Sequence, residues 1–123
     1  MLCRSLSLIA IAASVSSASV APADARALLD HALPAIGSTA PGPPTVALWF
    51  SEEVEPVFSG ITVTNAKGVR VDEGKISVVL HDARELNAAL KPLSPGAYEV
   101  HWHAVSVDTH RTQGQFTFTV APG

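Results

Sequence analysis

Apolar and polar positions alternate most regularly near the C-terminus of the chain. In residues 98–105 a valine, a tryptophan and an alanine alternate with two histidines and a valine, and in residues 116–120 two phenylalanines and a valine alternate with threonines. A period of two with aromatic and β-branched residues is typical of strands that bury one face. The pattern predicts two strands joined by a short loop, and this loop carries Asp108 and His110.

Shorter segments of the same kind precede this pair of strands. The expected strands are residues 45–51, 61–64 and 75–80, and the expected turns are residues 65–68 and 72–74. Residues 85–90 fit a helical turn or a strand, residues 52–60 form a connection, and the Pro- and Gly-rich residues 31–44 form an edge segment with a turn. Many short strands separated by Gly/Pro turns predict an all-β antiparallel sandwich or small barrel.

The N-terminus has the composition of a targeting segment. A short basic start is followed by an apolar run, residues 6–13, and then by small residues. The run is too short to span a bilayer, so residues 1–23 are interpreted as a secretory signal peptide, with an uncleaved anchor helix as the alternative. Small residues at −1 and −3 favour a cut after Ala23 or Ala25, and the boundary lies between 23 and 30.

Length, charge and sulfur content limit the possible functions. The 123 residues form one domain with a formal charge of −3 and no basic run, which argues against a nucleic-acid partner. Cys3 and Met1 are the only sulfur-containing residues. A chain that has lost its signal peptide therefore has no disulfide, no thiolate metal site and no thioether metal site.

Several polar residues are candidates for metal binding. Asp108 and His110 lie two residues apart, so in extended chain both side chains point the same way and converge on one ion. The alternative is a turn aspartate beside a solvent-exposed histidine. His101 and His103 face outward on the preceding strand, either as a metal pair or as a solvated polar face. The remaining candidates are His31 and the acids Glu52, Glu53 and Glu55.

Six motifs in order resemble the CopC family of periplasmic copper-resistance proteins. They are His-Ala at His31, Trp-Phe-Ser-Glu, Phe-Ser-Gly-Ile-Thr-Val, Leu-Ser-Pro-Gly-Ala-Tyr-Glu-Val-His-Trp, Val-Ser-x-Asp-x-His and Gly-x-Phe-x-Phe-x-Val. Each motif is weak alone, but the ordered set is specific. The resemblance implies an immunoglobulin-like Greek-key β-sandwich of about seven strands, formed by residues 31–121.

The resemblance also implies a Cu(II) site. In the family, a histidine that begins the mature chain binds through its amine and its imidazole, the loop aspartate and histidine complete the site, and the glutamate of Phe-Ser-Glu stands close by. The corresponding residues are His31, Asp108, His110 and Glu52. Imidazole and carboxylate ligands suit tetragonal Cu(II). The methionine-rich Cu(I) site of some family members is expected to be missing.

One feature departs from the family. A free amine on His31 requires cleavage after Asp30, with Leu28 at −3, which breaks the small-x-small rule. The ordinary cuts leave residues ahead of His31, so that its ring remains a possible ligand while the amine chelate is lost.

Three functions follow from these features. The resemblance implies a non-catalytic periplasmic carrier for copper resistance or homeostasis that passes Cu(II) to a partner such as a membrane copper transporter. The cleavage context favours the alternative of an immunoglobulin-like interaction module with a weakened or vestigial site. A copper oxygenase with a histidine brace is disfavoured, because the Asp108 carboxylate would fill coordination space that oxygen needs.

Overall fold

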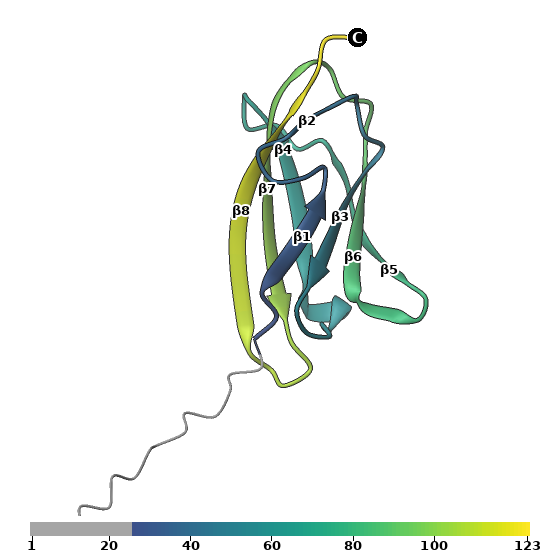
Figure 1. The fold of residues 1–123 in the computed structure, drawn as a ribbon, viewed down its shortest axis with the longest axis vertical. Helices are drawn as coiled ribbons and strands as arrows, with labels where there is room; N and C mark the ends of the chain where they lie inside the picture. Colours follow the sequence, from purple (N-terminus) through teal and green to yellow (C-terminus); the bar gives the residue numbers. More distant parts are fainter. Residues whose placement is uncertain (1–25) are drawn as a thin grey trace, which may run out of the picture.

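The chain folds into a sandwich of two four-stranded sheets. The computed structural model describes residues 26–123 (Figure 1), and the expected signal peptide lies outside them. The elements are β1 (Leu29–Leu33), β2 (Thr39–Ala40), β3 (Thr45–Phe50), the 3₁₀ turn η1 (Pro56–Phe58), β4 (Gly60–Asn65), β5 (Asp72–Val79), β6 (Asp82–Leu90), β7 (Gly96–Val105) and β8 (Arg111–Val120). None of the helical segments in this part of the chain has the length and apolar character needed to cross a membrane.

The strand order explains how the two layers are connected. One sheet has the order β1-β3-β6-β5 and the other β2-β8-β7-β4. The chain crosses between the sheets after each of β1, β2, β3, β4 and β6, whereas β5–β6 and β7–β8 are antiparallel hairpins within a sheet. The predicted all-β Greek-key sandwich is therefore confirmed, with β2 as a two-residue addition to the expected set of about seven strands.

Two local predictions differ from the structure in instructive ways. Residues 72–74 were expected to form a turn, but they belong to β5, whose pairing with β6 shifts between Asp72 and Ile76. Gly74 has a φ of 82°, so the turn-like residues form a kink inside the strand and not a turn before it. The ambiguous residues 85–90 are part of β6, because alternate side chains there are buried between the sheets.

The core lies between the two sheets and follows the alternation along the strands. Its largest fully buried apolar side chains come from β3, β4, β6, β7 and β8: Val46, Leu48, Val63, Leu86, Val100 and Phe118. At the end of β3, Phe50 is buried while Trp49 lies on the outer face of its sheet. Trp102 packs against the core, with its ring 5.3 Å from Phe50 in an edge-to-face arrangement.

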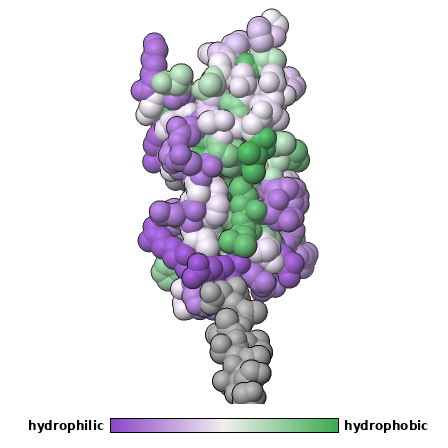
Figure 2. Space-filling view, turned by 60° about the vertical axis from the view of Figure 1, so that its left-hand side comes forward, coloured by the Kyte–Doolittle hydropathy of each residue, from purple (hydrophilic) through white to green (hydrophobic). Residues whose placement is uncertain are grey.

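Several large apolar side chains remain outside this core. They include Leu28, Leu33, Ile36, Val57, Phe58 and Leu80. Figure 2 shows an elongated apolar band, bordered by polar side chains, on the side of the molecule that it presents. The surface of the sandwich is therefore apolar in places and not uniformly polar.

A buried carboxylate fixes the connection between β4 and β5. Asp72 Oδ2 accepts a hydrogen bond from the backbone N–H of Val63 at 2.9 Å. Its Oδ1 accepts from the backbone N–H of Gly74 at 2.9 Å and from Arg70 Nη2 at 2.7 Å. Burial raises the pKa of Asp72, but the hydrogen bonds from Arg70, Val63 and Gly74 outweigh burial and leave this pKa below its usual value. Asp72 is therefore a charged structural residue.

Asp72→Asn is expected to lower the free energy of unfolding by about 1.5–3 kcal/mol at pH 7, the usual range for hydrogen bonds to a charged group. Because the folded-state pKa lies below the unfolded value of about 3.9, this stabilisation is present above that value and is lost as pH falls through the folded pKa. Urea unfolding of parent and variant at pH 7 and pH 3 measures the effect. The gap between them should shrink at pH 3.

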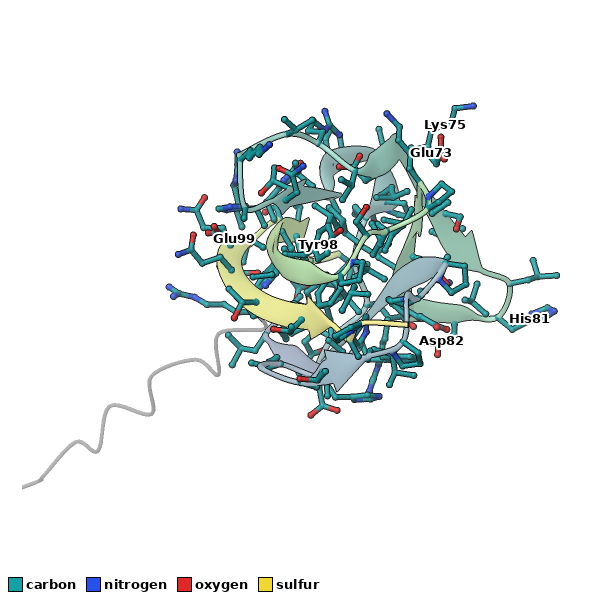
Figure 3. All side chains as sticks on the ribbon, turned by 90° about the horizontal axis from the view of Figure 1, so that it is seen from above. Glu73, Lys75, His81, Asp82, Tyr98 and Glu99 are labelled. Carbon is teal, nitrogen blue, oxygen red and sulfur yellow. The ribbon has the colours of Figure 1, made fainter. Side chains whose placement is uncertain are left out.

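A matched control for this variant is available on the same strand. Glu73 is exposed and points away from the molecule (Figure 3), so Glu73→Gln should change stability by less than about 0.5 kcal/mol. An Asp72→Asn loss that is equally large at both pH values would contradict the charged role of Asp72.

Candidate metal centre

The loop between β7 and β8 is pinned at both ends by one buried serine. Ser106 is fully buried, and its backbone N–H donates to the carbonyl of His110 at 2.9 Å. Its carbonyl accepts from the N–H of Thr109 at 2.9 Å, and its Oγ lies 3.3 Å from the N–H of His110. Thr109 has a φ of 70°, which completes the tight turn. The loop is therefore a fixed platform.

This platform presents two potential ligands to solvent. Asp108 and His110 are both exposed, and within residues 26–123 neither side chain makes a hydrogen bond or an ion pair. A carboxylate and an imidazole that are positioned but not used internally are suited to binding an external ion. Asp108 and His110 were predicted from the sequence, but the role of Ser106 was not, although a serine at the strand end of the Val-Ser-x-Asp motif was a visible signal.

The loop that contains Glu52 lies directly beside this platform. Val54 forms an antiparallel bridge with Ser106, and the N–H of Val107 donates to the carbonyl of Glu53 at 3.2 Å. The N–H of Glu55 donates to the carbonyl of Val105 at 2.8 Å. Glu52 itself is half-buried. The structure thus brings Glu52's loop together with Asp108's loop and makes this end of the sandwich rich in carboxylates.

The start of the described chain reaches the same end. The carbonyl of Ala27 accepts a hydrogen bond of 2.6 Å from Thr112 Oγ1, two residues after His110. Ser51 Oγ donates to the carbonyl of Arg26 at 3.2 Å and accepts from the N–H of Leu28 at 3.0 Å. In Figure 1 the beginning of β1 and the β7–β8 loop lie together at the lower end. Residues 26–28 are therefore held next to both loops.

His31 occupies a different place. It lies on β1 opposite Trp49 of β3, and its ring stacks on the indole with centroids 4.4 Å apart and an interplanar angle of 7°. Its Nδ1 is 2.9 Å from Asp30 Oδ2. The extended chain rises about 3.3 Å per residue, so His31 is roughly 13 Å along from Ala27. Its ring faces the outside of the β1-containing sheet.

The structure therefore brings together only some of the four residues predicted as metal ligands. Within residues 26–123 there is no group of three or more histidines, aspartates and glutamates placed to hold a metal ion. Asp108 and His110 share one loop, Glu52 is on the adjoining loop, and His31 is apart from them. The candidate site therefore consists of two potential ligands on one loop, Asp108 and His110, and would need a further donor.

His101 and His103 lie away from this platform. The ten-residue β7 carries both on the outer face of its sheet, opposite Thr62 and Gly60 of β4. The prediction that both histidines face outward is confirmed.

Comparisons with known proteins agree on one family. The model of the CopC domain matches residues 29–121. Protein YobA of Escherichia coli K12 is 39% identical over 98 residues, which cover 78% of this chain and 79% of that protein. Copper resistance protein C of Xanthomonas campestris pv. juglandis is 34% identical over 116 residues, or 89% of each chain.

A solved structure extends this similarity to three dimensions. The crystal structure of CopC from Methylosinus trichosporium OB3b superposes with a TM-score of 0.74 at 32% identity, covering 79% of this chain and 95% of that one. Sequence, strand order and the motif around Asp108 and His110 point the same way. This chain belongs to the CopC domain family.

Proposed function

We propose that this protein is a periplasmic Cu(II) carrier that acts in copper resistance or homeostasis, without catalysis. The observation that carries the proposal is the platform of Asp108 and His110, held by Ser106 and exposed to solvent. An ion bound there lies at the surface, where a partner protein can take it. The relatives named for copper resistance support the same role.

The proposed site holds one tightly bound Cu(II). Asp108 and His110 are its ligands, and Glu52 lies on the adjoining loop, where its charge adds to the attraction for a cation. Neutral imidazole and carboxylate oxygen are ligands that tetragonal Cu(II) accepts. With Met1 and Cys3 as the only sulfur-containing residues, the chain has no ligands for a methionine-rich Cu(I) site.

The further nitrogen donor has two candidates. His31, named by the family resemblance, would have to leave its stack on Trp49 and bind through its ring. The other candidate is the amine of residue 26, which cleavage after Ala25 would create. Residues 26–28 already lie beside Ser51 and Thr112, so this second donor needs less rearrangement.

His31→Ala is expected to lower Cu(II) affinity far less than loss of a loop ligand, because the His31 ring is stacked away from the loop. Tryptophan emission checks this in a Trp102→Phe background, where Trp49 is the reporter. Binding at the loop would take the His31 ring off Trp49, so Cu(II) bound through His31 should change the Trp49 emission. A change of Trp49 emission at one equivalent, removed by His31→Ala together with tight binding, would make His31 a full ligand.

Secretion and delivery complete the proposal. Residues 1–23 act as a signal peptide that directs the protein to the periplasm, and the carrier passes copper to a membrane copper transporter. The second candidate function is an interaction module with a vestigial metal site. It is favoured by the finding that residues 26–123 contain no preassembled group of three metal-binding side chains.

A further inference from the structure

The outer face of the β4–β7–β8 sheet carries a polar hollow that is separate from the loop platform. In the strand register, His101 lies between Thr62 and Gln115, and His103 lies between Gly60 and Gln113. These rows border a hollow of about 420 Å³ that is lined by Trp102 and Gly114 and by six polar residues: Thr62, His101, His103, Arg111, Gln113 and Gln115. Two imidazoles therefore share one concave, polar surface.

Glu99 orients the first imidazole. Its Oε1 lies 3.0 Å from Nε2 of His101, and both residues face outward because they are two apart on a regular strand. Figure 3 shows Glu99 on the outside of the sheet, whereas Tyr98 points to the interior. With Nε2 beside the carboxylate, Nδ1 is the ring nitrogen of His101 that remains available to an ion. Carboxylate–imidazole pairs of this kind orient histidines that bind metals.

Gly60 fixes the second imidazole. A Cβ on residue 60 would lie 2.5 Å from Cε1 and 3.1 Å from Nε2 of His103, so the ring rests in the space that glycine leaves open. His103 is half-buried as a result, while His101 is exposed. The two rings are thus placed differently, one beside the Glu99 carboxylate and one packed against the backbone of Gly60.

We propose that His101 and His103 form a second, weaker site for Cu(II) or Zn(II). Side chains two apart on one strand have Cα atoms roughly 7 Å apart, a span that two bonds of about 2.0–2.1 Å from ring nitrogens to one ion can bridge. Water and the amide oxygens of Gln113 or Gln115 fill the remaining positions. The site is weaker because no third histidine or acidic ligand joins the pair among residues 26–123 and because the Arg111 cation borders the hollow.

This second site is independent of the loop platform, so its test uses His110→Ala protein in which the loop ligand is gone. Zn(II) is titrated into the secreted protein by calorimetry, and the histidine ring resonances are followed by NMR. We expect residual binding that shifts the His101 and His103 resonances. Adding His101→Gln and His103→Gln together should abolish it.

Gly60→Ala is the more specific variant, because it keeps both histidines in the sequence and changes only the position of the His103 ring. The added Cβ displaces the His103 ring, and Zn(II) affinity should fall about tenfold or more. Gly42→Ala is the matched control, since its Cβ meets only the carbonyl of Leu93 at 4.0 Å and should change nothing. If Gly60→Ala lowers the melting temperature, the double histidine variant decides. Unchanged Zn(II) affinity in that double variant overturns the proposal, whatever the loop site does.

Discussion

Replacing His110 by alanine is expected to lower Cu(II) affinity by about 100-fold or more. Even the loss of a residue that only hydrogen-bonds to a metal ligand typically lowers metal affinity by about 10–100-fold. In the proposed site, the imidazole is one of two side-chain ligands on the loop. Its loss leaves Asp108 with no nitrogen donor from the same loop. Competition for Cu(II) against a chelator of known affinity measures the change.

The fold should survive this substitution. The His110 side chain is exposed, and residue 110 contributes to the loop through its backbone N–H and carbonyl, both directed at Ser106. Alanine keeps these two groups. His81→Asn is the matched control, because His81 is exposed at the tip of the β5–β6 hairpin and its φ of 72° suits asparagine. Copper affinity equal to that of the parent in His110→Ala would remove His110 from the site.

Trp102→Ala should produce the largest loss of stability, about 3 kcal/mol, at the lower end of the range for buried tryptophan because the ring is only partly buried. The ring contacts Phe50 edge to face, and it fills the space over Gly114, where a Cβ would lie 2.7 Å from Cζ2. Removing it leaves a cavity at the seam of the two sheets. For a domain of this size the melting temperature should drop by roughly 12–24 °C.

The second tryptophan provides the control. Trp49 lies on the outer face of its sheet and its ring stacks on His31, so Trp49→Ala removes surface packing and should cost clearly less. Thermal unfolding of both variants compares the two faces directly. Melting of Trp102→Ala at the parent temperature, or a larger drop for Trp49→Ala, would contradict the assignment of Trp102 to the core.

The fold was predictable because strand alternation is a local signal. Val100 and Ala104 are buried while His101 is exposed, as the period of two requires. The prediction of a turn at residues 72–74 was wrong for a physical reason. Acidic residues followed by a glycine at positive φ are also the usual composition of a turn. Nothing in the local sequence says that the Asp72 carboxylate is buried and accepts hydrogen bonds from three residues, Val63, Arg70 and Gly74.

The candidate site was predictable in part. Asp108 and His110 are close in sequence, so one hairpin loop brings them together. The loop of Glu52 is brought beside theirs by pairing between residues 53–55 and 105–107, which only the sandwich creates. His31 was assigned by its place in the motif order. Its stacking on Trp49 depends on the register between β1 and β3, which local sequence does not determine.

The most direct test of the copper-carrier proposal is a Cu(II) titration of the secreted protein by electron paramagnetic resonance, after its intact mass has identified the first residue. The account predicts one tight tetragonal Cu(II) species with nitrogen and oxygen ligands, saturating at one equivalent before any weaker species appears, and absent from His110→Ala. If the intact secreted protein binds Cu(II) no more tightly than the His110→Ala variant does, the copper-carrier proposal is contradicted and the interaction module is favoured.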